Sequence, residues 1–187
     1  MNLILFSGYG ETATNEKSYW YDGDFVPCMK AALDMKAALD VNAALDVKEV
    51  YIDPHTLPSG DNIVVGHSSG ALKVYDMHSS PPILSILIDP VPIKTNNILT
   101  GNEPDEVKDM YLNHTPSADF VYSGRAIHVR NLRPTKPILM EAFMNEQEII
   151  KKWPQTYPII FNDIGHNLHQ KRWVAGIICS TASFLLS

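Results

Sequence analysis

The stretch that decides the fold is "NIVVGHSSGALKVY", residues 62–75. It begins with β-branched residues and continues, without a loop, into a segment of helix-forming residues. Between the two lies Gly66-His67-Ser68-Ser69-Gly70, which fits the pattern G-x-S-x-G. A serine at the tip of a sharp strand-to-helix turn adopts a strained backbone, and the flanking glycines leave room for neighbouring elements. The stretch therefore predicts a nucleophile elbow with Ser68 as the nucleophile.

Apolar runs recur along the chain, and helix-like segments separate them. The runs are mostly continuous rather than alternating, which is typical of parallel strands covered on both faces. They occupy residues 2–6, 48–52, 62–66, 83–88, 137–143 and 158–162. Helices are expected at residues 26–46, 70–77, 104–113, 146–153 and 170–186. This pattern predicts the α/β class, with a mostly parallel, doubly wound sheet of about six strands and helices on both faces.

The length of 187 residues fits one domain spanning residues 1–187. Residues 92–136 are rich in turn-forming residues, and we expect an irregular excursion or a short cap there. Residues 29–49 repeat a six-residue unit of the type "MKAALD". We interpret this repeat as a lengthened covering helix, with a partner-binding helix as the alternative.

The composition narrows the classes of binding partner and the cellular compartment that we expect. A net charge of −6 gives the chain no electrostatic reason to bind nucleic acid or an anionic membrane. Cys28 and Cys179 form neither a zinc pattern nor a disulfide framework, which favours a reducing compartment. The start "MNLILFSGYG" has no basic leader. We therefore expect a soluble, cytoplasmic protein without stable membrane insertion, and leave its oligomeric state open.

A serine hydroxyl becomes a strong nucleophile only when a base removes its proton. Of the seven histidines, His166 in "NDIGHNLH" lies between the last expected strand and the last expected helix. Such a loop ends at the same edge of the sheet as the serine turn, so His166 is expected to reach Ser68. For the oxyanion hole we expect the backbone N–H groups of Ser69 and of Tyr9, which lies in the glycine-flanked turn "SGYG".

The motifs "FSGYG", "GHSSG", "ILIDPVP" and "IGHNLH" stand in an order that resembles the α/β-hydrolase superfamily. The resemblance runs from Leu3 to the C-terminus and implies a minimal α/β-hydrolase, similar to small lidless esterases and cutinase-like enzymes. The chain starts at what would be the third strand of the full fold, and Ser7 stands where many relatives have histidine. The motifs are specific for the superfamily but not for a substrate.

A triad also needs a carboxylate that orients the histidine and stabilises its positive charge. Asp89 ends the run "ILSILID", and an acid after this strand resembles the arrangement in pancreatic-type lipases and chlorophyllases. Glu146 follows the strand expected at 137–143, where most of the superfamily has its acid, while Glu141 lies within that strand. Asp163 stands beside the histidine loop. Asp89 is the preferred candidate, and Glu146 is the main alternative.

The predicted function is a serine hydrolase that cleaves a carboxylic ester or thioester through an acyl-enzyme intermediate. This chemistry requires no cofactor and no metal, and the expected partner is a small or lipid-like ester. The alternative is a non-catalytic protein of the same fold that binds a partner or small ligand. A P-loop or Rossmann nucleotide binder is disfavoured, because "FSGYGETA" lacks the spacing G-x-G-x-x-G and no Gly-Lys-Ser/Thr follows an expected strand.

Overall fold

The structure, a computed structural model, describes residues 1–8, 20–39, 47–75, 82–89, 125–132, 156–162, 164–165 and 167–186. The strands are β1 (Asn2–Phe6), β2 (Glu49–Ile52), β3 (Asn62–His67), β4 (Leu84–Ile88), β5 (Arg125–Leu132) and β6 (Thr156–Asn162). The helices are α2 (Phe25–Leu39), α3 (Gly70–Tyr75) and α6 (Arg172–Leu185), with 3-10 turns η1 (Asp22–Asp24) and η2 (Leu168–Gln170).

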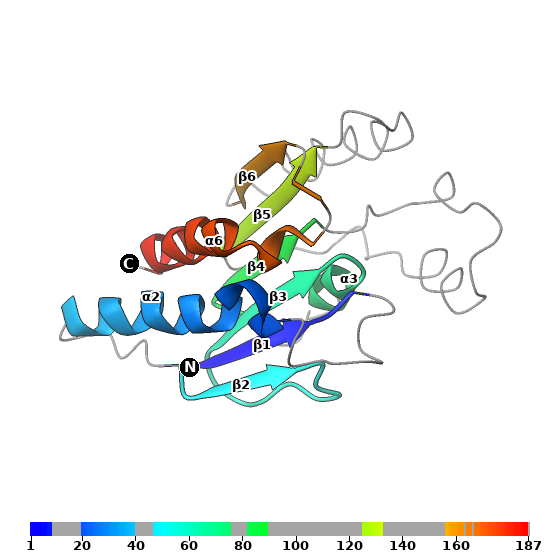
Figure 1. Ribbon diagram of the computed structural model, residues 1–187. Helices are drawn as coiled ribbons and strands as arrows, with labels where there is room; N and C mark the ends of the chain where they lie inside the picture. Colours follow the sequence, from blue (N-terminus) through cyan, green and yellow to red (C-terminus); the bar gives the residue numbers. More distant parts are fainter. Residues whose placement is uncertain are drawn as a thin grey trace.

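The strands form one parallel sheet in the order β2-β1-β3-β4-β5-β6 (Figure 1). In a parallel sheet the carboxyl ends of all strands lie at one edge. Phe6 pairs with Gly66, and His67 pairs with Ile88. The residues that follow β1, β3 and β4 therefore meet at that edge. This arrangement confirms the predicted α/β class and the parallel sheet.

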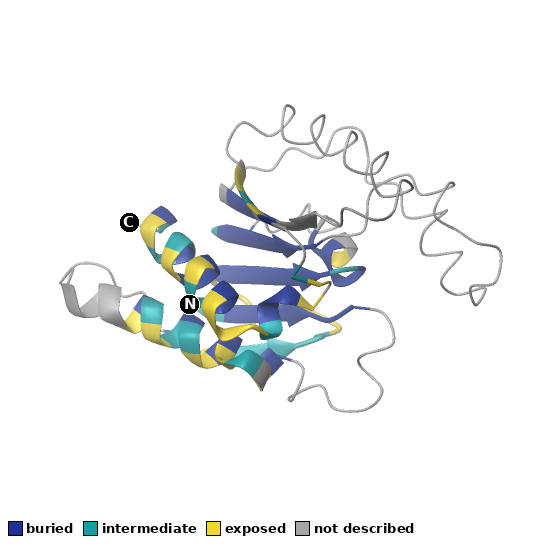
Figure 2. Cartoon of the chain, turned by 45° about the horizontal axis from the view of Figure 1, so that its top comes forward, coloured by how far each residue is buried: buried dark blue, intermediate teal, exposed yellow. Residues whose placement is uncertain are grey.

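Apolar residues of the strands alternate between two core clusters. Leu3 and Leu5 belong to the cluster shared with α2 and α6, whereas Ile4 and Phe6 belong to the cluster shared with α3. The helices α2 and α6 run side by side over one face of the sheet (Figure 1), and the inner strands are buried throughout (dark blue in Figure 2). Because both faces are covered, the strands read as continuous apolar runs. Each fully buried aliphatic side chain contributes about 1.5–3 kcal/mol.

Most of the expected strands are confirmed, and one was missed. The runs at 2–6, 48–52, 62–66, 83–88 and 158–162 form β1, β2, β3, β4 and β6. In contrast, β5 falls within residues 92–136, where we expected an irregular excursion or a short cap. The strand expected at residues 137–143 and the helices expected at 104–113 and 146–153 lie outside the described residues.

The reason β5 was missed is its mixed sequence, "RAIHVRNL". Ala126, Ile127 and Val129 are buried, but arginine and histidine interrupt the apolar run. An inner strand of a parallel sheet is usually recognised by an unbroken run, and β5 lacks one. Its pairing with β4 and β6 places it firmly inside the sheet.

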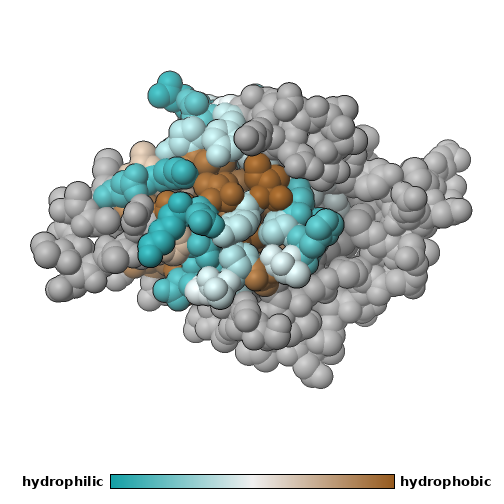
Figure 3. All heavy atoms as spheres, turned by 90° about the horizontal axis from the view of Figure 1, so that it is seen from below, coloured by the Kyte–Doolittle hydropathy of each residue, from teal (hydrophilic) through white to brown (hydrophobic). Residues whose placement is uncertain are grey.

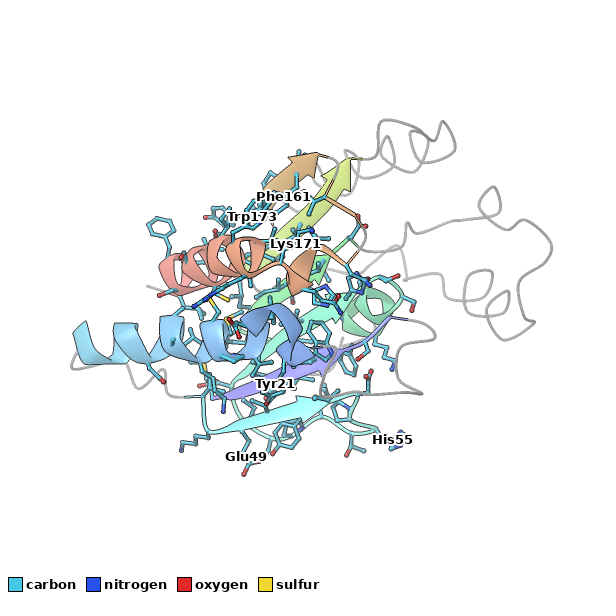
Figure 4. All side chains as sticks on the ribbon, viewed as in Figure 1. Tyr21, Glu49, His55, Phe161, Lys171 and Trp173 are labelled. Carbon is cyan, nitrogen blue, oxygen red and sulfur yellow. The ribbon has the colours of Figure 1, made fainter. Side chains whose placement is uncertain are left out.

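The surface carries apolar residues at both margins of the sheet. On the β2 side, viewed from below in Figure 3, apolar atoms lie at the centre of the face among more hydrophilic ones. On the other side, Trp173 of α6 is exposed and packs edge-on against Phe161 of β6, with ring centroids 5.4 Å apart (Figure 4). None of the helices in the described part of the chain has both the length and the apolar character that a membrane span requires.

Candidate active site

Ser68 occupies the turn between β3 and α3 and has a strained backbone. Its φ of 52° lies in the left-handed region, which non-glycine residues seldom adopt. The Ser68 N–H donates to the carbonyl of Ile88 at 3.0 Å, and the Ala71 N–H donates to the Ser68 carbonyl at 3.2 Å. These two bonds fix the turn to β4 on one side and to α3 on the other. Ser68 is only partly buried, so the side chain stands at the accessible carboxyl edge of the sheet.

Close contacts explain the glycines on either side of Ser68. A Cβ atom at Gly70 would lie 2.2 Å from the carbonyl oxygen of Phe6, and one at Gly66 would lie 2.6 Å from Cα of Ala71. Neither contact is sterically possible without movement of the backbone. Gly70 therefore allows α3 to approach the end of β1, and Gly66 allows α3 to start directly over β3. The packing requires both glycines of the G-x-S-x-G pattern.

Three residues that directly follow strands share the same backbone geometry. The φ values of Asp53, Ser68 and Asp89 are 44°, 52° and 40°. Like Ser68, the two aspartates donate their N–H groups to a neighbouring strand, Asp53 to the Leu5 carbonyl at 2.8 Å and Asp89 to the Val129 carbonyl at 2.7 Å. Consequently β2, β3 and β4 end in the same way at one edge. Asp89 lies one strand away from Ser68, and Asp53 lies on the opposite side, beyond β1.

Asp89 is the one candidate acid within the described residues. It is 7% exposed and follows β4, the strand that pairs with β3. Glu146, Glu141 and Asp163 lie outside the described residues. The strand beside β6 is β5, and the segment between them in sequence, residues 133–155, contains Glu141, Glu146 and Glu148. Glu146 therefore stays the alternative that the sequence offers.

Two further histidines are buried beside the serine turn. His67 and His169 are both fully buried, and their ring centroids are 4.5 Å apart. His169 belongs to η2 and also packs against Trp20, with ring centroids 5.1 Å apart. This stack joins β3 to the segment that leads from the histidine loop into α6. His166 itself, like Tyr9, lies outside the described residues.

Ser7, which follows β1, is held from two sides. Its N–H lies 3.1 Å from Oδ1 and 3.3 Å from Oδ2 of Asp53, to which it donates. Its Oγ accepts a hydrogen bond of 2.9 Å from Nε1 of the buried Trp20. Asp53 also pairs with the ammonium group of Lys73 at 3.1 Å. The start of the "SGYG" turn is therefore anchored to β2, to α3 and to the segment that leads into α2.

The sequence analysis did not identify Asp53, although a signal was present. The tripeptide Ile-Asp-Pro occurs twice, at residues 52–54 and 88–90, in each case at the end of a strand. Only the second occurrence was interpreted. His55, in the loop after β2, is exposed (Figure 4).

Comparison with known proteins identifies the fold. EstE5 superposes with a TM-score of 0.57 at 13% identity, covering 99% of this chain and 75% of that chain. A hormone-sensitive lipase from a metagenome library gives 0.53 at 12% identity, covering 100% and 77%. The esterase domain of a Rhodothermus marinus protein gives 0.53 at 11% identity, covering 100% and 88%. No family model and no curated protein sequence matches the chain.

These similarities confirm the resemblance found in the sequence: the chain has the α/β-hydrolase fold. At identities of 11–13% they establish the architecture, and the chemistry has to be argued from the residues of this chain.

Proposed function

We propose that this chain is a serine hydrolase that cleaves carboxylic esters, with Ser68 as the nucleophile. The observation that carries the proposal is the strained turn at Ser68 between Gly66 and Gly70. Backbone strain of this kind costs on the order of 1–3 kcal/mol and is concentrated at functional sites. A nucleophile elbow uses it to hold the hydroxyl clear of the sheet edge, where a substrate can approach. The esterases and lipases of similar fold support the same chemistry.

In the proposed reaction, Ser68 Oγ attacks the ester carbonyl while His166 accepts the hydroxyl proton. The N–H groups of Tyr9 and Ser69 stabilise the negative charge on the carbonyl oxygen. Collapse of the tetrahedral intermediate breaks the bond to the alcohol, which takes the proton from His166. Water, activated by His166, then releases the acid from Ser68. Ser68 and His166 return to their starting protonation states, so no co-reactant other than water is consumed.

Asp89 is the carboxylate that we propose for the triad. Asp89 directly follows β4, the strand that pairs with β3, and the Ser68 N–H donates to the carbonyl of Ile88, the residue before Asp89. Its burial suits a carboxylate that orients an imidazole rather than one that contacts the substrate.

The test is covalent labelling with a fluorophosphonate, followed by intact-mass measurement and peptide mapping. Wild-type protein is expected to gain one adduct, on Ser68. Ser68→Ala should gain none, and His166→Ala should react more slowly by a factor of about 10³ or more, because the hydroxyl has lost its base. Ser180→Ala, which changes an exposed serine of α6, is the matched control and should label normally.

Hydrolysis of a series of p-nitrophenyl esters, from acetate to dodecanoate, then measures the acyl preference of the site. A folded wild-type protein that neither reacts with the fluorophosphonate nor hydrolyses any ester would contradict the proposal. That result would favour the non-catalytic, ligand-binding alternative.

A further inference from the structure

The backbone that leads into the expected oxyanion loop is fixed by a carboxylate from another strand. Ser7 is the first residue after β1, and its N–H donates to the Asp53 side chain. Asp53 is the first residue after β2, and its own N–H donates back to Leu5 of β1. The carboxylate thus takes the place of the strand carbonyl that β2 no longer supplies. The hydrogen-bond ladder between β1 and β2 is extended by one residue.

The backbone at Ser7 is also in contact with the serine turn. Successive residues of a strand direct their N–H and C=O groups to opposite neighbours. Leu5 bonds to the β2 side, and the carbonyl of Phe6 lies against Gly70, on the β3 side. The Ser7 carbonyl lies on that side as well, because a Cβ at Gly70 would be 2.6 Å from its oxygen. Ser7 is therefore held by Asp53 through its N–H and lies against the serine turn through its C=O.

We infer that Asp53 is a positioning residue for the oxyanion hole. By accepting the Ser7 N–H it fixes the backbone at the end of β1, immediately before the segment that contains Tyr9. This inference rests on the proposed function, since an oxyanion hole matters only if Ser68 is acylated.

The surroundings of Asp53 fit this role. Its side chain is 11% exposed, whereas that of its partner Lys73 is 53% exposed. The bond to the Ser7 N–H is shielded from water and is strengthened by the negative charge. The ion pair with Lys73 is mostly solvated and contributes little to stability. The ammonium group of Lys73 balances the negative charge of the Asp53 carboxylate. The hydrogen bond from the Ser7 N–H is the contact through which Asp53 fixes the start of the loop.

The decisive variant is Asp53→Gly, which removes the carboxylate and relieves the backbone strain at a φ of 44°. Because the misplaced N–H groups stabilise mainly the transition state, kcat for a p-nitrophenyl ester should fall about 10- to 100-fold, with KM changed less than about twofold. A trifluoromethyl ketone, whose adduct with Ser68 carries an oxyanion, should bind more weakly by the same factor. Asp53→Asn keeps an oxygen that accepts the Ser7 N–H, so it should recover most of kcat.

Two controls separate positioning from folding and from charge. Asp24→Gly makes the same change at another aspartate. Asp24 also has a positive φ, 65°, and it also forms an ion pair, with Arg172 at 3.3 Å. Lys73→Met removes the ion pair of Asp53, together with the contact of the Lys73 ammonium group over the Phe6 ring, 5.3 Å from its centroid. Both controls should keep kcat within about twofold of wild type.

Equal kcat in Asp53→Gly and wild type, or equal losses in Asp53→Gly and Lys73→Met, would overturn the inference. The proposed function fails separately: in that case wild type itself neither labels on Ser68 nor hydrolyses the ester, whatever stands at position 53.

Discussion

The two sides of Ser68 are built alike and surrounded differently. On the β4 side Asp89 follows its strand with a φ of 40°, and on the β1–β2 side Asp53 follows its strand with a φ of 44°. Both belong to an Ile-Asp-Pro tripeptide, and both donate a backbone N–H to the neighbouring strand. Yet Asp53 binds the Ser7 N–H and Lys73, while Asp89 stands on the strand beside the nucleophile.

The comparison shows that the positive-φ conformation at the strand end does not by itself decide the role of the aspartate. Aspartate tolerates positive φ better than most residues, so it is a natural choice for ending a strand abruptly. What differs is the strand on which each aspartate sits relative to β3. In our proposal a carboxylate one strand away on the histidine side serves the base, and one on the opposite side orders the oxyanion loop.

The largest difference between the two sides is expected from Asp89→Asn. If Asp89 orients His166, the amide cannot stabilise the imidazolium, and kcat should fall by a factor of about 10³–10⁴. Asp53→Asn, the same change on the other side, should have a much smaller effect. Steady-state kinetics with one ester substrate measures both variants under identical conditions.

Glu146→Gln completes this test. It should leave kcat unchanged within about twofold if Asp89 is the acid. The reverse result, with Glu146→Gln inactive and Asp89→Asn active, would move the acid to the position that most of the superfamily uses.

A smaller effect, on folding rather than on catalysis, is expected where the serine turn meets the β1 side. A Cβ at Gly70 would lie 2.2 Å from the Phe6 carbonyl oxygen and 2.6 Å from that of Ser7. Because these are backbone atoms that cannot move aside easily, Gly70→Ala should lower the free energy of unfolding by about 3 kcal/mol. Urea denaturation gives the value directly.

The matched control is Gly176→Ala in α6, where the added Cβ has no atom within 4 Å apart from the adjoining backbone of the helix. Alanine is the better helix former, so this variant should gain up to about 1 kcal/mol. If the two alanine substitutions change the free energy of unfolding in opposite directions, the contact with the end of β1 destabilises Gly70→Ala, and not the loss of glycine as such. A loss of similar size at both positions would argue against close packing at the turn.

The strands and the serine turn could be predicted because their signals are local. Continuous apolar runs correspond to β1, β3 and β4, which are covered on both faces, and Ser68 is marked by glycines within two residues of it. Strand β5 could not be recognised in this way, since polar residues interrupt its apolar positions. Its place in the sheet depends on pairing with β4 and β6, which are distant in sequence.

The surroundings of the serine turn were less predictable than the turn itself. Asp53 contacts Ser7 across 46 residues and Lys73 across 20 residues of sequence. Trp20 reaches Ser7 from a segment with no motif of its own. Contacts of this kind arise only when the parallel sheet brings several strand ends to one edge. A search for candidate acids after every strand, rather than only after the later ones, would have found Asp53.

The smallest effect is expected far from this edge, in the layer of α2 and α6. Cys179 is fully buried, with Sγ 3.9 Å from the Phe25 carbonyl oxygen. Burial, and secondarily the neighbouring Cys28, raise the pKa of the Cys179 thiol well above its usual range. An unfolded chain loses this proton above about pH 8.5, whereas the folded protein keeps it. The folded state then binds more protons, so stability should fall as pH rises, by at most about 1.4 kcal/mol per pH unit.

Urea denaturation of wild type and Cys179→Ala between about pH 8 and pH 10 isolates this contribution. The slope of unfolding free energy against pH should be less steep in Cys179→Ala, while kcat stays that of wild type. Identical slopes would mean that the thiol titrates alike in both states and is not shielded between the helices. We expect no change in kcat, because Cys179 is separated from the residues around Ser68. A change in kcat would mean that the layer of α2 and α6 is coupled to the strand edge that carries Ser68.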